Sequence, residues 1–558
     1  MKLRGILLAL LCVPSVVHAG GLFLPGSGAV STSRAGAGVA SSDDGEALAL
    51  NPAGLAKTTG WTITISATMI DYFMQFTRAG SYDQLSETDT AYEGSKFPTI
   101  KNAAKPPLGF GGVQPVPVIA IISDLNNAIP GLHVAVGVFA PNAYPFRDMT
   151  NGYQFGTSGD DVAPPPSRYD IMKQEAAVIL PSLAVAYHIN DMFDVGARFS
   201  AGIANLKSTT VLWGMPQNFD EYVGKDGIFT IDAKDGFVPV FALGALFRPT
   251  PNLEFGINWE SEASIQAKGS AASQNGKDVT LNGTPIVIKP PEDSGARCSP
   301  GGAEGALKAC VGLSLPMNAQ IGGRYKWLDS AGEQKADLEV NLDWEHWGKT
   351  CSVNSQGVQD DLNCTSPTTY RVTVDGVVFL RPGGGQPDMD TSLGLKDSTV
   401  SHGLKDTYGI RIGGSYRIPL DERHANSVIL RGGLAYDTAA ATAGWLRSDL
   451  DGAARTTITV GGAYKTKRYR IDAGGGVVLE GTSTNSNLLA GNQVCNPTGS
   501  AGNVGCADGI TENPIGNRHG PDPINPLLDP ARQAENPVTQ GTYQSHYLMF
   551  MLGFTTWF

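Results

Sequence analysis

The side chains most able to do covalent chemistry are cysteines, and they occur in close pairs. Six of the seven cysteines follow residue 20, and the two members of each pair share one short stretch. Six cysteines allow fifteen connectivities, of which proximity favours the local ones. A local disulfide closes a small loop, stabilises by roughly 3 kcal/mol and needs an oxidising compartment. No pair has the Cys-x2-Cys spacing of a zinc site, so we expect disulfides at Cys298–Cys310, Cys351–Cys364 and Cys495–Cys506.

The histidines and the isolated acidic residues form no pattern that points to catalysis or metal binding. His346 falls on the apolar face of a predicted strand, and His402 and His519 fall in predicted loops. None has a serine and a carboxylate at a spacing that would suggest a triad. We therefore expect a protein that is not an enzyme and that holds no metal and no cofactor. We interpret the acidic residues that calcium could otherwise use as solvated loop carboxylates: Asp43, Asp44, Asp388 and Asp390.

One segment carries a row of carboxylates on a single face. Between residues 336 and 345, polar and mostly acidic residues alternate with leucine, valine and tryptophan, which in a strand places the two sets on opposite faces. Like charges in a row repel one another unless cations compensate them, and arginines follow the same phase in neighbouring segments. The ladder either holds a wall and a plug together or handles a ligand and protons. Its predicted members are Arg324, Asp337, Glu339, Asp343, Glu345 and Arg411.

The elements that carry these residues are predicted to be strands. Alternation with a period of two recurs along the chain and marks an even number of strands, fourteen. Short connections alternate with long ones, and all three cysteine pairs fall in long ones. This is the pattern of an outer-membrane barrel with short periplasmic turns and long outer loops. The predicted strands are 61–76, 113–124, 131–141, 175–189, 192–207, 237–248, 252–268, 313–328, 335–347, 406–418, 427–437, 455–466, 468–480 and 545–558.

Composition agrees with a barrel. Charged residues make up 17% of the 558 residues, below the roughly 25% of soluble domains. The net charge of −12 argues against a nucleic-acid partner, and the mean hydropathy of −0.10 excludes a bundle of apolar helices. Residues 1–19 combine two basic residues, a short apolar run and a small-residue end, which predicts a signal peptide and export.

Residues 20–57 lie between the signal and the first strand and show neither alternation nor an amphipathic stripe. They are rich in glycine, alanine and serine and end near Asn51, Pro52 and Ala53. Pro52 keeps Asn51 out of the helical region. We interpret this stretch as a plug around which residues 58–558 form an all-β, antiparallel barrel.

The plug, with its Asn51-Pro52-Ala53 motif, resembles the N-terminal hatch of the FadL-type (OMPP1/FadL/TodX) outer-membrane transporters of long-chain fatty acids and other hydrophobic compounds. Segments such as GLHVAVGVFAP (131–141) and DTYGIRIGGSYRI (406–418) are also similar to strands of that family. The resemblance implies a monomer in the bacterial outer membrane, surrounded by lipid and lipopolysaccharide, that lets hydrophobic molecules pass passively. The terminal Phe558 resembles the signal that the barrel insertion machinery reads. The motif residues are expected to set the conformation of the hatch.

Two further sets of residues bear on transport. Pro115 and Pro117 remove two successive donors toward one neighbouring strand, and Gly137 follows on the next strand. Because the family resemblance implies a lateral opening near the third strand, we expect a weak seam there; an ordinary bulge is the alternative. Apolar residues in the lumen phase would contact either a greasy ligand or the hatch: Val178, Leu180, Met549 and Met551.

Three other functions remain as alternatives. Aromatic hydrocarbons would need the same apolar path as fatty acids. A surface receptor or adhesin would use the long outer loops. A general polar porin is disfavoured by the apolar lumen residues.

Overall fold

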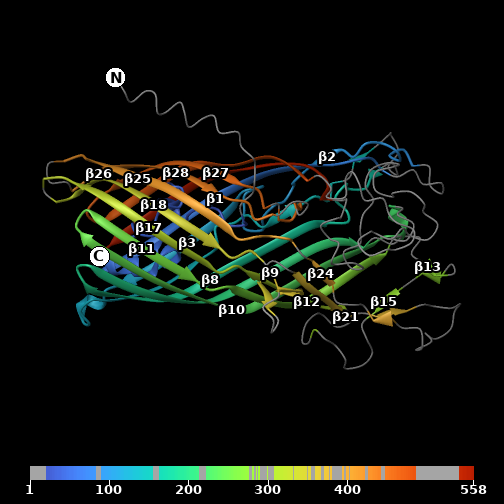
Figure 1. Ribbon diagram of the computed structural model, residues 1–558, viewed down its shortest axis with the longest axis horizontal. Coiled ribbons are helices and arrows are strands. Elements are labelled where there is room, and N and C mark those ends of the chain that lie inside the picture. Colours follow the sequence, from blue (N-terminus) through green and yellow to red (C-terminus); the bar gives the residue numbers. More distant parts are fainter. Residues whose placement is uncertain are drawn as a thin grey trace, which may run out of the picture.

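The computed structural model describes most of the chain between residues 21 and 558 (Figure 1). The predicted signal peptide lies outside the described residues. The segments not described are 1–20, 83–89, 152, 155–161, 213–220, 276–279, 282–283, 286, 290–297, 299–306, 331, 349, 354–358, 366–369, 376, 380–392, 395–397, 401, 422–424, 442–445, 451 and 486–538.

One antiparallel sheet with 14 wall positions closes into a barrel, which confirms the predicted fold class. The last wall strand pairs with the first over its whole length, so the sheet closes on itself. Two wall positions hold two strands in succession, β11 with β12 and β16 with β17. The wall strands are β1 (Trp61–Arg78), β3 (Gln114–Ser123), β4 (Leu132–Phe139), β8 (Ile171–Asn190), β9 (Phe193–Leu212), β10 (Gly227–Thr250), β11 (Leu253–Glu260), β12 (Ala263–Asn275), β16 (Leu307–Leu315), β17 (Asn318–Leu328), β18 (Gln334–Glu345), β25 (Thr407–Pro419), β26 (Ser427–Asp437), β27 (Arg455–Lys465), β28 (Tyr469–Asn485) and β29 (Gly541–Trp557).

Several wall strands run farther toward the loop end than predicted. β9 continues to Leu212, β10 begins at Gly227 and β12 continues to Asn275. The reason is that Gly227 pairs with Leu212 on one side and with Asn275 on the other, so the ladder is satisfied to its end.

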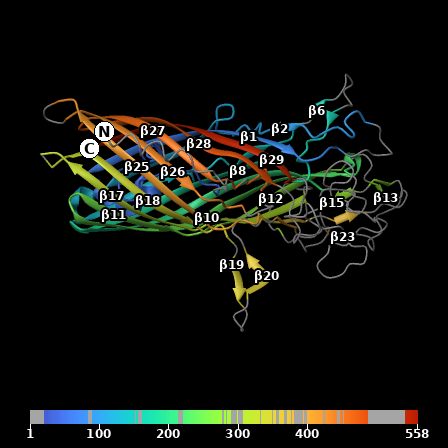
Figure 2. The same cartoon turned by 45° about the horizontal axis from the view of Figure 1, so that its top comes forward.

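Additional short strands lie at the loop end of the barrel. Four of them join the main sheet: β2 (Thr99–Lys101), β5 (Phe146–Asp148), β21 (Tyr370–Asp375) and β24 (Ser398–Val400). Figure 2 shows β19 (Thr350–Val353) and β20 (Gln359–Thr365) projecting away from the barrel. The strands of the small separate sheets are β6 (Tyr153–Gln154), β7 (Val162–Ala163), β13 (Thr280–Leu281), β14 (Thr284–Pro285), β15 (Val287–Lys289), β19 (Thr350–Val353), β20 (Gln359–Thr365), β22 (Val377–Phe379) and β23 (Leu393–Gly394).

The alternation that predicted the strands is also what divides the two faces of the wall. On β18, Leu338, Val340 and Leu342 are exposed on the outside, whereas Asp337 and Glu339 are buried on the inside. An apolar outer face with a polar lumen is what a membrane barrel needs. Short turns gather at one end of the barrel and long connections at the other (Figure 1), as predicted.

The N-terminal segment, Gly21 to Gly60, lies inside this barrel. It forms two short helices and a 3-10 helix that pack against the wall, and most of its residues are buried. No helix of the described residues is long and apolar enough to cross a membrane. The helical elements are α1 (Ala29–Thr32), α2 (Ala47–Leu50) and the 3-10 helices η2 (Pro52–Lys57), η3 (Leu125–Asn127) and η4 (Val223–Lys225).

Candidate functional site

The Asn51-Pro52-Ala53 motif holds the end of the N-terminal segment in shape. Asn51 is extended (φ −160°) and its Oδ1 accepts from the N–H of Ala53 at 3.1 Å, which caps η2, while Pro52 takes the first position of that helix. The amide nitrogen of Asn51 donates to the carbonyl of Val39 at 2.8 Å and, at 3.4 Å, to that of Ala245 on β10. The motif therefore joins two parts of the N-terminal segment and the wall.

The residues predicted to form a charge ladder contact an arginine of the N-terminal segment. Arg34 donates to both carboxylate oxygens of Asp337 at 3.1 and 2.8 Å and to Glu339 at 3.2 Å, and all three side chains are buried. Glu339 also accepts from the backbone N–H of Ala40 at 2.8 Å. The acidic stripe of β18 thus receives its compensating charge from the N-terminal segment as well as from the wall.

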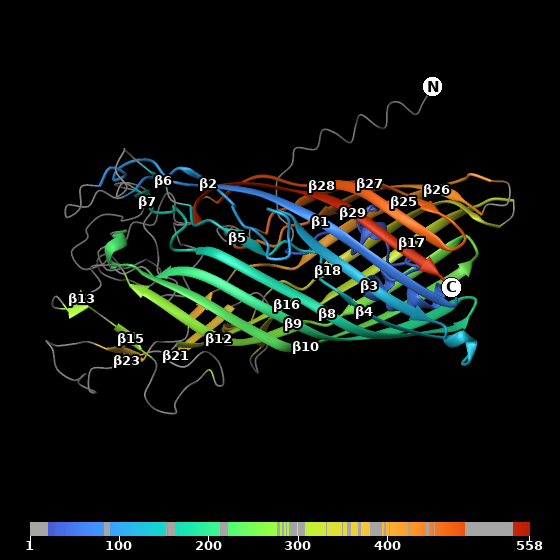
Figure 3. The same cartoon turned by 180° about the vertical axis from the view of Figure 1, so that it is seen from behind.

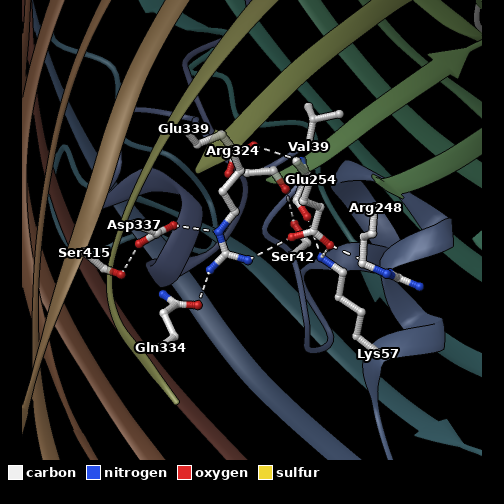
Figure 4. Close-up of polar contacts among 12 residues, drawn as sticks. Val39, Ser42, Lys57, Arg248, Glu254, Arg324, Gln334, Asp337, Glu339 and Ser415 are labelled. Atoms are coloured by element: carbon white, nitrogen blue, oxygen red, sulfur yellow. Dashed lines mark hydrogen bonds and ion pairs between the residues drawn. The ribbon is translucent and has the colours of Figure 1, made fainter. Parts of the chain in front are cut away.

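Arg324 extends this network around the wall (Figure 4). Its Nε lies 2.8 Å from Asp337, and its terminal nitrogens lie 3.1 Å from Glu254 and 2.7 Å from Gln334. Glu254 also receives Lys57 from the N-terminal segment, with 2.6 Å between the charged atoms. These contacts join the N-terminal segment to the wall.

The remaining predicted members of the ladder, Asp343, Glu345 and Arg411, form a second group of contacts. Arg411 lies 3.1 Å from Asp343 and also binds Asp437. Glu345 accepts from the hydroxyl of Thr407 at 3.2 Å and from the indole of Trp347.

The β3–β4 hydrogen-bond ladder stops beside Pro115 and Pro117, two residues of the predicted seam. The β4 strand pairs with β3 as far as Phe139 and ends there, whereas farther toward the loop end β8 pairs with β5 (Figure 3). Pro117 accepts from the N–H of Ala140 at 3.2 Å. In an antiparallel ladder the nitrogen and oxygen of one residue point to the same neighbour. The nitrogens of Pro117 and Pro115 therefore face this gap and have no hydrogen to donate.

The segment that would continue β4 pairs with the N-terminal segment instead of with β3. The carbonyl of Asn142 accepts from the N–H of Leu24 at 2.6 Å, and Phe23 and Ala143 form an antiparallel bridge. The amide group of Asn142 adds donations to the carbonyls of Leu24 and Pro25 at 3.4 and 3.0 Å.

Gly137 has a different place from the predicted one. It lies in an unbroken part of the ladder, opposite Ala120 and Ser182. A Cβ at this position would overlap with the backbone carbonyl of Ile119 and with the side chain of Leu48 in the N-terminal segment. The interruption begins three residues later, at Ala140.

An apolar cavity of about 240 Å³ lies behind the gap. Pro115, Pro117 and the exposed Leu108 stand at its outer rim, and Phe23 reaches it from the N-terminal segment. Its inner lining includes Ile231, Ile265, Val311 and Leu313 from the opposite wall. The lining therefore includes both residues that face the lumen and the exposed Leu108.

The four predicted apolar lumen residues divide into two pairs. Val178 lines the apolar cavity, and Leu180 lines a neighbouring cavity. Met549 and Met551 are buried and belong to a cluster that includes Leu24 and Ala29 of the N-terminal segment.

Buried charges tie the outer loops together above the lumen. Asp170, after β7, binds Arg447 and accepts from the hydroxyl of Ser448 at 2.8 Å. Asp449 lies 3.1 Å from Arg447 and 2.7 Å from His402. Burial raises the pKa of Asp449, but the charge of Arg447 and the His402 contact outweigh it, so the pKa lies below its ordinary value. Because His402 is buried and contacts Asp449, we interpret it as a structural residue of the loops.

The acidic residues that were expected to be solvated, and the remaining histidines, have different outcomes. Asp44 is not solvated: it is buried and binds Arg470 of the wall, because the N-terminal segment is packed against β28. Asp43 is exposed as expected. His346 Nδ1 donates to the carboxylate of Asp406 at 3.0 Å. Outside the described residues lie Asp388, Asp390 and His519.

The cysteine pairs are described only in part. Cys298 and Cys310 form a disulfide with a Cα–Cα distance of 5.5 Å. Cys351 and Cys364 face each other in the register of β19 and β20, but their side chains are not described. Cys495 and Cys506 lie outside the described residues.

Sequence reasoning missed three contributors to the site. Arg34 and Lys57 are cations of the N-terminal segment that face acidic wall residues, and the isolated charge of Arg34 in a small-residue stretch was a usable signal. Asn142 gave no signal, because its partner Leu24 is 118 residues away along the chain.

We compared the chain with known protein families and structures. A family model described as "Outer membrane protein transport protein (OMPP1/FadL/TodX)" matches residues 10–493. No curated protein matches the chain.

Several solved structures share the fold. A Pseudomonas aeruginosa FadL homologue aligns at 14% identity with a TM-score of 0.57, over 97% of this chain and 100% of that one. The toluene transporter TbuX of Ralstonia pickettii and the toluene transporter TodX of P. putida each align at 14% identity with a TM-score of 0.52, over 96% of this chain and 99% of theirs.

Proposed function

Because the chain belongs to the OMPP1/FadL/TodX family of outer-membrane transport proteins, we propose that it carries long-chain fatty acids passively across the outer membrane. The molecule enters the lumen from the outer loops, rests beside the N-terminal segment and leaves sideways through the β3–β4 gap. The N-terminal segment acts as a hatch, with Asn51, Pro52 and Ala53 fixing its conformation.

The observation that carries this proposal is the apolar cavity behind the gap. Its rim is formed by prolines that cannot close the ladder, and its outermost lining residue, Leu108, is 77% exposed. A greasy molecule in this cavity has apolar contacts from the lumen to the outer face of the wall, so its transfer into lipid never requires exposure to water.

The charge network supports a hatch that is held in place and not freely mobile. Arg34, Lys57 and Asn51 each join the N-terminal segment to a different wall strand. Weakening one of these contacts is expected to change passage without removing the cavity.

The test is uptake of a radiolabelled long-chain fatty acid by cells that lack their own outer-membrane transporter. Cells expressing this chain are expected to take up the label, and Asn51→Ala is expected to change the rate severalfold at equal surface expression. Asn205→Ala, an exposed asparagine of β9, is the matched control. A correctly folded barrel without uptake would contradict the fatty-acid assignment.

Aromatic hydrocarbons are the second candidate. Two of the structures that share the fold are described as toluene transporters, and a cavity of this size accepts a single ring as readily as an acyl chain. Labelled toluene in the same cells separates the two: uptake of toluene alone would replace the first proposal. Uptake of neither would favour a surface receptor.

A further inference from the structure

A second cavity, of about 110 Å³, adjoins the apolar cavity and differs from it in chemistry. The two share Phe23, Ala140, Pro141 and Leu315 on their linings, so they are neighbouring parts of one space. We call the second one the polar cavity. It is enclosed by the N-terminal segment, the segment after β4 and the β10, β11 and β17 wall.

Three polar atoms on the lining of the polar cavity have no hydrogen-bond partner among the described residues. They are Asn142 Oδ1, Asn258 Oδ1 and Ser27 Oγ, and the three residues are 5%, 3% and 8% exposed. A buried polar atom left without a partner is costly, so three around one small cavity point to a missing partner.

The identity of one of these atoms is fixed by its surroundings. The amide nitrogen of Asn142 donates to the carbonyls of Leu24 and Pro25. Because only an N–H can make those bonds, the atom left over is the oxygen, which is an acceptor. This acceptor needs a donor from the cavity.

The charges around the polar cavity are already engaged. Among its described lining residues the cation is Arg411, which binds Asp343 and Asp437. The carboxylates on the lining, Glu260 and Glu345, are bound by Arg198 and by Thr407. An anionic head group would therefore lie among acceptors and carboxylates, with no lining cation left to pair with it. Its loss of hydration would not be compensated.

We propose that the polar cavity binds the head group of the transported molecule as an uncharged hydrogen-bond donor, a hydroxyl or an undissociated carboxyl, while the apolar tail lies in the apolar cavity. The inference rests on the proposed function, because it assumes that the two cavities hold the transported molecule. It separates amphipathic molecules with a donor from pure hydrocarbons and from carboxylate anions.

The test is a competition between an alcohol and its methyl ether, in which a methyl group replaces the hydrogen of the donor. Purified barrel in detergent is incubated with equal concentrations of 1-dodecanol and dodecyl methyl ether, and native mass spectrometry reports the ratio bound. The wild type is expected to prefer the alcohol about fivefold to tenfold, the worth of one hydrogen bond to a buried acceptor. Asn258→Leu is expected to lower that preference while still binding the ether.

Gln174→Leu is the matched control. Gln174 is also a buried amide with an unpartnered oxygen, but it lines the apolar cavity and not the polar one. If the head group lies in the polar cavity, this variant keeps the preference of the wild type. A loss of preference in Gln174→Leu and not in Asn258→Leu would overturn the assignment.

Ionisation provides a second arm. Dodecanoic acid is expected to bind more tightly at pH 4 than at pH 8, because its uncharged fraction falls through that range, whereas 1-dodecanol is unaffected. Equal binding of alcohol and ether, or of the acid at both pH values, overturns the inference and leaves hydrophobic transport standing. Failure of all these molecules to bind overturns both.

Discussion

Gly196 on β9 and Gly244 on β10 lie directly opposite each other, and the turn at Asn51 and Pro52 fills the space that side chains there would take. A Cβ on Gly196 would overlap with the backbone of Pro52, and one on Gly244 with Oδ1 of Asn51. The paired glycines make a dent in the wall that receives the motif. This contact accounts for how an otherwise loop-like segment obtains one position in the lumen.

Filling the dent is expected to displace the N-terminal segment. Gly244→Ala should lower the free energy of unfolding by about 1–3 kcal/mol, as overpacking usually does, and should raise passive uptake. Thermal unfolding of the purified barrel measures the first effect. Gly432→Ala on β26 is the control, because the nearest atom to its Cβ would be Thr459 O at 3.7 Å, an ordinary contact. Equal behaviour of the two variants would mean that the dent does not position the motif.

The repeated elements of the fold could be predicted from sequence, whereas the site could be predicted only in part. Alternation such as that of Leu338 and Val340 is local, so it revealed the strands, their number and the lumen face. The ion pair of Arg34 with Asp337 spans 303 positions, and no local pattern encodes it. Pro115 and Pro117 located the gap because a missing donor is a property of the residue itself. The pairing of Asn142 with Leu24 could not be predicted, because it depends on a residue 118 positions away and not on a property of Asn142 itself.

The prolines at the rim are expected to keep the gap open. In Pro115→Val/Pro117→Val, residue 117 gains an N–H facing Ala140, so the β3–β4 ladder can extend. We expect uptake of the hydrophobic substrate to fall severalfold while thermal unfolding is unchanged or occurs at a higher temperature. Pro181→Val on β8, another wall proline, is the control. Normal uptake by the double variant would show that the missing donors do not govern the exit.

A covalent link between the N-terminal segment and the gap tests whether they must separate. Phe23 and Ala143 form an antiparallel bridge, a geometry that brings Cβ atoms within reach of a disulfide. Phe23→Cys/Ala143→Cys is expected to block uptake when oxidised and to recover when reduced. The wild type with and without reductant controls for reduction of the Cys298–Cys310 disulfide. Unchanged uptake in the oxidised variant would argue for a hatch that stays in place during transport.

The outer loops are expected to loosen in acid. Because the pKa of Asp449 is lower in the folded state than its ordinary value, the unfolded chain binds a proton first as the pH falls. The stabilisation is therefore present above about pH 4 and is lost as the pH falls below that value. We expect the thermal midpoint of the wild type to drop by a few degrees more between pH 5 and pH 3 than that of Asp449→Asn. If the thermal midpoints of the two proteins fall in parallel with pH, Asp449 does not contribute to the loss of stability in acid.

The ion pairs of Arg34 with the wall should be the costliest contacts of the N-terminal segment to break. Arg34→Met leaves the carboxylates of Asp337 and Glu339 buried with one cation fewer, and breaking such a pair from one side typically costs about 3–5 kcal/mol. Arg417→Met, which touches the half-exposed Glu333, is the matched change and should cost less than about 1 kcal/mol. Adding Asp337→Asn and Glu339→Gln to Arg34→Met is expected to restore part of the loss, because neutral amides need no cation. Chemical unfolding of the refolded barrels measures all three. If Arg34→Met and Arg417→Met cost the same, the network inside the barrel is hydrated well enough to screen its charges, and the hatch must be held by packing against residues such as Gly196 and Gly244.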